Sequence, residues 1–410
     1  MLKTSVLVKP PIAKKTPKSI EKHNDVRLDN YFWMNDRENK EVIEHLNAEN
    51  AYTKSVLKHT EAFQKDLFEE MKGRIKEDDS SVPYKLNGYW YITKFQKGKD
   101  YPIYTRKKET LEAPETIILD CNEMAKGHAY FKLGGISISP DNTMASFAVD
   151  TVSRRQYTLQ IKNLKTGEIF SDKIENTTGS STWANDNKTL FYAKKDAVTL
   201  RSDKIYKHKL NTEATSDVLV YHETDDTFNA FVYKTKSKKY IVIGCSSTLT
   251  SEYRILNAET PDSHFKIFQE RTRELEYSIA HYNDSFYIIT NKDGAINFKL
   301  QKTSEHNTQK ENWKDVLPYR KDVLLEDIEI FDNYLVINER ENGLNKIRIM
   351  SWNGDEDYYL PFDNETYTAT LGNNPDFNST ELRYSYNALT TPSSVIDYNF
   401  ITKVKTVKKE

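Results

Sequence analysis

The first part of the chain carries a helical pattern of apolar residues. Over residues 39–75, apolar side chains recur every three or four positions, and charged residues fill many of the positions between them. This spacing is typical of amphipathic helices, which bury one stripe of side chains and expose the others. The stripe consists of Val42, Leu46, Val56, Leu57, Phe63, Leu67, Met71 and Ile75.

The stripe predicts two helices with a break between them at residues 58–60. A threonine side chain can accept a hydrogen bond from the first free N–H groups of a helix, so we expect Thr60 to cap the second helix. Glu61 then lies in the first turn, where its carboxylate faces the positive end of the helix dipole. We expect residues 1–76 to form an N-terminal arm that contains both helices.

From Ser81 onward the hydrophobic period changes to two. Short runs of aromatic and β-branched residues, such as residues 88–93 and 101–105, are separated by turn-forming pairs such as Asn-Gly and Asp-Asn. No helical stripe of ten residues separates these runs, which disfavours a parallel sheet built from βαβ units. Residues 77–410 are therefore predicted to be all-β.

One hydrophobic strand pattern recurs seven times in this all-β region. The copies begin at residues 90, 145, 190, 241, 286, 335 and 382, so successive copies lie 45 to 55 residues apart. A four-stranded propeller blade occupies about 40 to 50 residues. We therefore predict a seven-bladed β-propeller over residues 77–410, preceded by the short α-helical arm.

Two local features support this assignment of blades. Three copies share a turn directly before the strand, at residues 140–143, 185–188 and 235–238. One outer hairpin is marked by residues 165–167, which lie between two strand-like runs. How the ring closes stays open, because exchange of a first strand into the last blade needs a β-strand within residues 1–11, where Val6-Leu7-Val8 is short for one.

The charge balance excludes a generic binder of polyanions. Lys and Arg total 59 and Asp and Glu total 61, which leaves a net charge of −2 and no field to attract nucleic acid or an anionic membrane. The N-terminal apolar run is too short for a signal peptide, and no apolar stretch approaches the ~18 residues of a membrane span. We therefore expect a cytoplasmic protein with no nucleic-acid or membrane partner.

The aromatic and cysteine contents indicate a folded protein without a disulfide scaffold. Aromatic residues make up 12% of the chain, which indicates a folded protein rather than a disordered one. The two cysteines, Cys121 and Cys245, stand too far apart for a CxxC motif and are too few for a disulfide scaffold. We expect both to be buried, reduced thiols.

The chain lacks the sequence motifs of the common catalytic sites. No two of its 13 glycines are four apart, which excludes the Gly-x-Ser-x-Gly elbow, and no two are two apart, which excludes Gly-x-Gly-x-x-Gly. No two histidines are four apart, which excludes a HExxH metal site. We therefore predict no catalytic residue, no metal site and no cofactor in this chain. The nearest approach to a ligand cluster is His222 with Glu223, Asp225 and Asp226, which we interpret as a solvated acidic loop between blades.

Other charged groups suggest binding or a different chemistry. Some propellers hydrolyse sugars with carboxylates around the central channel, and a glycosidase would need several acids to converge there. The candidate acids lie at residues 225–226, 326–329 and 355–357. Such groups are expected by composition alone, since 29% of the residues are charged. The basic pair Arg154-Arg155 can dock a carboxylate partner, although an exposed turn is the usual role of such a pair.

Nine short segments follow one another in a distinctive order along nearly the whole chain. They are residues 23–36, 46–52, 83–91, 139–143, 153–157, 183–186, 225–228, 250–252 and 389–392. In these segments the chain resembles the prolyl oligopeptidase family, and most of all its oligopeptidase B (protease II) branch. The resemblance implies an N-terminal helical arm and a seven-bladed propeller, which are followed in the family by a C-terminal α/β-hydrolase domain with a Ser-Asp-His triad.

The resemblance also implies what this chain lacks. We expect the chain to end just past the last blade, so that the C-terminal α/β-hydrolase domain is absent and no catalytic residue can be assigned. The family consists of serine-type oligopeptidases, and the oligopeptidase B branch cleaves peptides after Arg or Lys. Whether this chain is itself an enzyme therefore stays uncertain, and we expect it to be inactive alone.

In such a peptidase the propeller covers the active site and admits short, flexible peptides while it excludes folded proteins. The expected partners are a hydrolase domain of the same or a companion chain and short basic peptides. Arg154, Arg155, Asp225 and Asp226 are our candidates for substrate gating or for the domain interface. The alternative is a stand-alone propeller that binds peptides or proteins.

Overall fold

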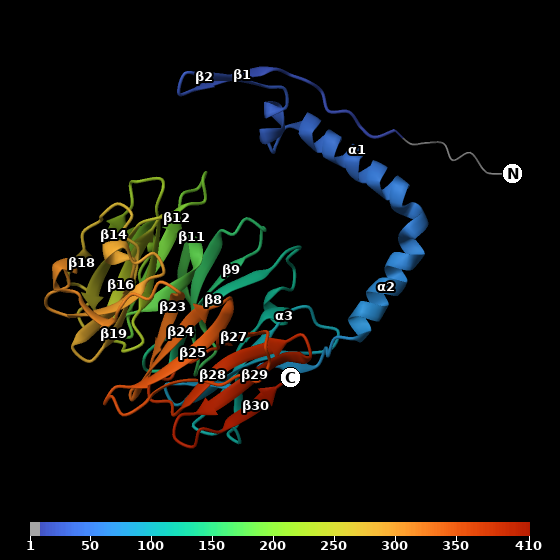
Figure 1. The fold of residues 1–410 in the computed structure, drawn as a ribbon. Coiled ribbons are helices and arrows are strands. Elements are labelled where there is room, and N and C mark those ends of the chain that lie inside the picture. Colours follow the sequence, from blue (N-terminus) through green and yellow to red (C-terminus); the bar gives the residue numbers. More distant parts are fainter. Residues whose placement is uncertain (1–8) are drawn as a thin grey trace. The chain divides into compact units, whose positions relative to one another are not determined.

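The computed structural model describes residues 9–410 (Figure 1). The chain divides into two compact units, Met1–Glu77 and Asp78–Glu410. The described part of the first unit contains a two-stranded hairpin and two helices. The elements are β1 (Lys18–Lys22), β2 (Asp25–Asp29), η1 (Phe32–Asn35), α1 (Lys40–Leu57), η2 (Lys58–Thr60) and α2 (Glu61–Gly73).

The two helices that the apolar stripe predicts are present, but the expected cap is wrong. Thr60 closes the 3-10 turn η2 and has helical backbone angles, so it does not take the extended conformation of a capping residue. Its hydroxyl instead donates to the carbonyl of Leu57, with an oxygen–oxygen distance of 2.7 Å. Asn39 caps the first helix, since its side-chain oxygen accepts from the backbone N–H of Glu41 at 2.9 Å.

The second unit consists of antiparallel sheets. Blade 1 contains β3 (Asp79–Ser80), β4 (Tyr84–Leu86), β5 (Tyr89–Phe95), β6 (Ile103–Lys108) and β7 (Glu115–Asp120), followed by α3 (Cys121–Met124). Blade 2 contains β8 (Lys132–Ile138), β9 (Met144–Asp150), β10 (Tyr157–Asn163) and the first part of β11 (Ile169–Trp183). Blade 3 contains the end of β11, β12 (Thr189–Lys195), β13 (Ser202–Lys209) and β14 (Val218–His222), with η3 (Ala214–Ser216) before β14.

The remaining four blades have four strands each. Blade 4 contains β15 (Asn229–Lys234), β16 (Tyr240–Ser246), β17 (Ser251–Asn257) and β18 (Lys266–Gln269). Blade 5 contains β19 (Tyr277–Tyr282), β20 (Ser285–Thr290), β21 (Lys299–Ser304) and β22 (Lys314–Leu317), with η4 (Lys292–Gly294) and η5 (Lys310–Asn312) in its loops. Blade 6 contains β23 (Val323–Ile330), β24 (Tyr334–Glu341), β25 (Leu344–Ser351) and β26 (Asp357–Tyr359), and blade 7 contains β27 (Tyr367–Leu371), β28 (Glu381–Ala388), β29 (Thr391–Asn399) and β30 (Lys405–Lys409).

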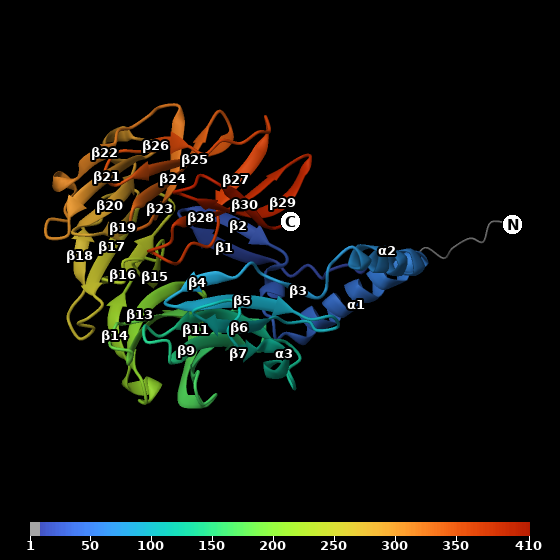
Figure 2. The same cartoon turned by 90° about the horizontal axis from the view of Figure 1, so that it is seen from below.

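This topology confirms the predicted seven-bladed propeller. Five sheets form one blade each, and the seven-stranded sheet forms two blades that share β11. Figure 2 shows the blades following one another around the ring in chain order, from cyan to red. The second strands of the blades begin at residues 89, 144, 189, 240, 285, 334 and 381, each one residue before a predicted copy.

The strand order gives the propeller two faces. One side of the propeller, which we call the hairpin face, carries the loops between second and third strands and also the connections between blades. Its second-to-third loops are residues 96–102, 151–156, 196–201, 247–250, 291–298, 342–343 and 389–390. The turns between first and second strands lie on the other side, which we call the turn face; they are residues 87–88, 139–143, 184–188, 235–239, 283–284, 331–333 and 372–380. Both ends of the propeller, at Asp78 and at the end of β30, lie toward the hairpin face because the first strand of a blade starts there and the fourth returns to it.

The hydrophobic core lies between neighbouring blades. A cluster of buried apolar residues joins blade 1 to blade 2, and similar clusters join each following pair up to blades 6 and 7. Among the described residues no such cluster joins blade 7 to blade 1. We call this seventh junction the seam.

The seam is closed by side chains and not by a shared strand. All four strands of blade 7 come from residues 367–409, so within residues 9–410 no N-terminal strand enters that blade. The segment Val6-Leu7-Val8, which the sequence leaves open as an exchanged strand, lies outside the described residues. Across the seam, Arg383 donates to the carbonyl of Pro83 at 2.7 Å, and Lys409 pairs with Asp79 and donates to the carbonyl of Ser80.

Two further expectations concern the thiols and the helices. Cys121 and Cys245 are free and fully buried, as predicted. Burial raises the pKa of the Cys121 thiol to about 12 and that of the Cys245 thiol to about 11. No helix formed by residues 9–410 is both long and apolar enough to cross a membrane.

Candidate functional site

The hairpin face brings all four candidate residues of the sequence together on one side of the propeller. Arg154 and Arg155 lie in the β9–β10 hairpin of blade 2, and Asp225 and Asp226 lie in the connection from blade 3 to blade 4. All four side chains are exposed. The same face carries the first and last residues of the propeller, at Asp78 and at the end of β30.

The β9–β10 hairpin holds its arginines through the backbone. Buried Asp150 accepts from the backbone N–H groups of Val152 at 2.9 Å and Arg155 at 2.7 Å. Arg155 has a φ of 54°, a left-handed conformation that this tight hairpin imposes. Neither guanidinium, of Arg154 or of Arg155, forms an ion pair or hydrogen bond with another described residue. Both charges are therefore available to a partner on the hairpin face.

The acidic loop between blades 3 and 4 is only partly solvated, which corrects the sequence interpretation. Glu223 is 3% exposed and forms an ion pair with Arg271 at 2.5 Å. Burial raises the pKa of Glu223, but hydrogen bonds from Arg271 and Tyr221 outweigh burial and leave this pKa below its usual value. Asp225 remains on the surface, where bonds from the side chain and backbone of Thr227 hold its pKa low.

Two arginines that the sequence analysis did not single out fix this loop. Arg201 donates to the carbonyls of Glu223 at 3.2 Å, Asp225 at 3.1 Å and Phe228 at 2.8 Å. The Arg271 guanidinium lies 3.7 Å above the Phe228 ring. Arg201 and Arg271 stand 24 and 46 positions from Asp225, so only the ring of blades brings them to the loop, and no local motif marks them.

The hairpin face also carries exposed apolar side chains at its outer tips. Five of the seven second-to-third loops expose one large apolar residue each: Val152 at 65%, Val198 at 90%, Leu249 at 55%, Ile296 at 76% and Leu389 at 97%. Single exposed apolar residues are ordinary, and these five become surface to bury only when a partner covers the hairpin face. The hairpin face thus combines apolar tips with unpaired charges.

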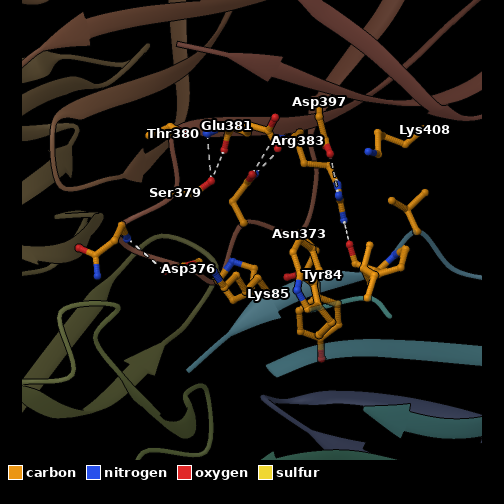
Figure 3. A pocket seen from close by; sticks show the side chains of 17 residues that line it. Tyr84, Lys85, Asn373, Asp376, Ser379, Thr380, Glu381, Arg383, Asp397 and Lys408 are labelled. Carbon is orange, nitrogen blue, oxygen red and sulfur yellow. Dashed lines mark hydrogen bonds and ion pairs between the residues drawn. The ribbon is translucent and has the colours of Figure 1, made fainter. Parts of the chain in front are cut away.

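A cavity of about 310 Å³, lined by both charged and apolar residues, lies at the seam, toward the turn face (Figure 3). Arg383 forms a two-point ion pair with Asp397, with distances of 2.7 and 2.8 Å. Figure 3 shows this guanidinium between Asp397 and the blade 1 segment that carries Tyr84. Lys85 and Lys408 also line the cavity. Among the described residues, the seam is therefore the junction joined by charged and polar contacts without an apolar cluster.

The three acidic groups considered for sugar hydrolysis do not form one site. Asp225 pairs weakly with Arg271 at 3.8 Å on the hairpin face. Glu326 and Glu329 are held by other partners, Arg340 and Lys236 respectively, and Asp357 is bound at two points by Arg348 within blade 6. Within residues 9–410, no group of three His, Cys, Asp or Glu side chains is placed to hold a metal ion.

Comparison with known proteins supports the fold and its context. Residues 10–410 match the family model described as "Prolyl oligopeptidase, N-terminal beta-propeller domain". Dipeptidyl aminopeptidase BI of Pseudoxanthomonas mexicana is 38% identical over 407 residues, which cover 95% of this chain and 56% of that protein. Protease 2 of Moraxella lacunata is 31% identical over 405 residues, which cover 97% of this chain and 58% of that protein.

A solved structure likewise matches this chain over part of its own length. Oligopeptidase B from Leishmania major superposes with a TM-score of 0.92 at 28% identity, and the match covers 98% of this chain and 60% of that one. The chain thus spans somewhat more than half the length of these three relatives. These relatives pair the propeller with a C-terminal hydrolase domain.

Proposed function

Because the chain belongs to the prolyl oligopeptidase family, as its N-terminal β-propeller portion, we propose that it is the non-catalytic lid of a serine peptidase that cleaves short peptides. The observation that carries the proposal is the match over residues 10–410 to a propeller that relatives join to a hydrolase domain. The chain supplies the cover of the active site, and the triad comes from the catalytic part.

The topology of the propeller supports docking of the catalytic part on the hairpin face. Both ends of the propeller lie toward the hairpin face, so a domain joined to the end of β30 meets this face first. The apolar tips, among them Val198 and Leu389, offer surface to bury there. Arg154, Arg155, Asp225 and Asp226 supply charges that pair across the interface and favour the closed arrangement.

The lid selects substrates by size. A propeller that covers the active site leaves a confined space that an extended peptide can enter and a folded protein cannot. Closure of the lid also removes water from the reacting groups and completes the site. The substrates in our proposal are therefore short, flexible peptides.

The cleavage specificity in our proposal is for peptides with Arg or Lys before the scissile bond. It rests on the similarity to a protein named oligopeptidase B and on the resemblance of nine sequence segments to that branch. A relative with 38% identity is named a dipeptidyl aminopeptidase, which releases dipeptides. Substrate tests must therefore include both an internally cleaved basic peptide and a dipeptide-releasing one.

The first test is activity of the purified chain. We expect no cleavage of a chromogenic peptide that ends in Arg or Lys, because no serine elbow is present in residues 1–410. Cleavage should appear when the chain is joined to the region encoded directly downstream or to a companion hydrolase chain. Robust cleavage by the chain alone that a serine-directed inhibitor blocks would contradict the proposal.

The same assay tests the interface. The double variant Arg154→Glu/Arg155→Glu should weaken binding of the catalytic part by about tenfold, because it reverses two unpaired charges on the hairpin face. Lys165→Glu is the matched control, since Lys165 is an exposed cation in the β10–β11 hairpin on the turn face. Equal binding by the double variant and the control would remove these arginines from the interface.

The alternative function is a stand-alone propeller that binds peptides or proteins. The downstream DNA separates the two functions. A reading frame with Gly-x-Ser-x-Gly in an α/β-hydrolase pattern supports the lid. A stop codon followed by an unrelated gene, with no companion hydrolase that co-purifies, supports the binding module.

A further inference from the structure

One turn on the turn face reaches across the centre of the propeller. The first strands of the seven blades surround a central channel, as in all propellers. The turn of blade 4, Thr235–Lys239, stands at the end of one of these strands, β15. Its buried Thr235 fixes the turn, because its N–H donates to the carbonyl of Tyr240 at 2.9 Å and its carbonyl accepts from Lys238 at 2.8 Å.

The turn is anchored to both neighbouring blades. On the blade 3 side, the Asn185 amide donates to the carbonyl of Lys238 at 3.0 Å. On the blade 5 side, Nδ1 of buried His281 lies 2.9 Å from the hydroxyl oxygen of Ser237. These contacts fix the position of the turn between its two neighbouring blades.

Two lysines of the turn contact blades that do not adjoin blade 4. Lys236 forms an ion pair with Glu329 of blade 6 at 2.6 Å, and its ammonium lies 4.0 Å above the Phe331 ring. Lys238 donates to the side-chain oxygen of Asn87 in blade 1 at 2.5 Å. Blades 6 and 1 lie two and three places from blade 4 around the ring. The two side chains therefore span the mouth of the channel in different directions.

The cavities at this mouth show the effect of the turn. One cavity of about 350 Å³ is lined by first-strand residues of blades 2 to 4 together with Asn87 of blade 1. A second cavity of about 230 Å³ is lined by first-strand residues of blades 4 to 6. Lys234 lines both, with Lys238 on the first side and Lys236 on the second. The blade 4 turn thus divides one channel mouth into two small cavities.

We propose that Thr235–Lys239 is a plug that closes the turn-face end of the channel, so that peptides enter the channel from the hairpin face only. The proposal rests on the geometry of the propeller and goes beyond the lid function. It assigns Lys236 and Lys238 the role of closing one of two possible routes for a peptide. A test on this chain alone can therefore fail without affecting the proposed function.

Cysteine labelling measures access on each side of the plug. Ala280 lines the cavity beside Lys236 and Ser181 lines the cavity beside Lys238, so Ala280→Cys and Ser181→Cys each place a cysteine in one cavity wall. The native thiols give little background because both are fully buried with raised pKa values. The probe is a maleimide that carries a polyethylene glycol chain, and the measured quantity is its reaction rate with each cysteine.

We expect each lysine to restrict the access of the probe to the cavity that it lines. Lys236→Ala should speed the labelling of Cys at position 280 by about tenfold or more, and Lys238→Ala should do the same at position 181. Lys188→Ala is the matched control, because Lys188 is an exposed lysine in the turn of blade 3 on the same face and lies outside the plug. It should leave both rates unchanged.

Two results would overturn the plug. One is an unchanged rate at both cysteines in the Lys236 and Lys238 variants, which would mean that the turn does not restrict access. The other is an equal rise at both cysteines in all three lysine variants, which would mean general loosening. Lys238 is exposed, so its variant is expected to fold even if the Lys236 variant does not, and it tests the plug independently.

Discussion

His208 is a fully buried histidine between two buried carboxylates. Its Nδ1 lies 2.7 Å from a carboxylate oxygen of Asp217, and its Nε2 lies 3.0 Å from one of Asp172. The Tyr192 hydroxyl donates to the second oxygen of Asp217 at 2.9 Å. Such a cluster is stable only while each buried charge has its partner.

The charge on His208 makes the stability of the propeller depend on pH. Burial lowers the pKa of His208, but the hydrogen bonds and charges of Asp217 and Asp172 outweigh it and raise this pKa above 6.5, the ordinary value for histidine. A raised pKa in the folded state contributes stability that is complete below about pH 6.5 and is lost as pH rises through the folded value. We expect His208→Gln to lower the free energy of unfolding by about 3 kcal/mol at pH 6 and by less at pH 9.

Urea unfolding at the two pH values measures this difference. His128→Gln is the control, because His128 is exposed and should change stability by less than about 0.5 kcal/mol at either pH. A loss in His208→Gln that is the same at pH 6 and pH 9 would mean that the imidazolium form is not what stabilises the cluster.

Residue partnerships of this kind could not be predicted from the sequence. The partners of His208 stand 36 and 9 positions away, and Arg271 stands 48 positions from Glu223. Nothing near His222 or Glu223 shows that Glu223 is buried and paired, so the loop has the composition of a solvated one. The buried cysteines were predictable because their wide separation in the sequence excludes a CxxC motif, and two cysteines are too few for a disulfide scaffold.

Elements were more predictable than contacts between residues. The second strand of each blade is fully flanked by other strands and carries the strongest apolar run, which is why all seven were placed to within one residue. β11 was not foreseen as one strand that serves two blades. It continues through Gly179, where φ is +100° and a Cβ atom would lie 2.9 Å from the Tyr157 ring. Only glycine fits there, and the sequence alone does not show that the Tyr157 ring lies against this position.

The helix α2 presents a face without a partner inside its own unit. None of its residues is buried, and Phe63, Phe68 and Met71 are 66%, 61% and 60% exposed. A helix of 13 residues is marginal in water without packing. We expect amides of α2 in the purified chain to exchange about 100-fold faster than those of β16 or β24, because few packed contacts hold the helix.

Hydrogen exchange followed by mass spectrometry measures this difference. The variant Phe63→Ser/Phe68→Ser should leave exchange in the blades unchanged and should reduce any self-association of the chain. Strong protection across α1 and α2 in a monomer would contradict the expectation, because it would require a partner for the apolar stripe.

At the scale of the whole molecule, the ring has one junction unlike the other six. Six junctions between blades hold apolar clusters, whereas among the described residues the seam has no such cluster and holds a cavity of about 310 Å³ with charged residues in its lining. The Arg383–Asp397 pair lies within blade 7, and it holds the Arg383 guanidinium that donates across the seam to the Pro83 carbonyl of blade 1. Seven blades were predictable from the repeat length, but a repeat does not show which junction differs.

We expect Arg383→Ala to open this junction before any other. The substitution leaves the carboxylate of Asp397, a residue only 5% exposed, without its cation and the Pro83 carbonyl without its donor. Loss of one partner of a buried ion pair costs about 3–5 kcal/mol. The free energy of unfolding should fall by that amount, and exchange should rise first in β3–β5 and β27–β30, which border the seam.

Arg348→Ala separates the effect of the seam from that of losing an ion pair. Arg348 binds Asp357 at two points within blade 6, with distances of 2.7 and 2.6 Å, just as Arg383 binds Asp397 within blade 7. Unlike Arg383, Arg348 donates no hydrogen bond to a described residue of blade 1. Its loss should raise exchange in β25 and β26 and leave blade 1 unchanged. If Arg348→Ala raised exchange in blade 1 as much as Arg383→Ala, the blades would open as one cooperative unit. If only Arg383→Ala does so, the ring opens at the seam, because that is the one junction where charge replaces apolar packing.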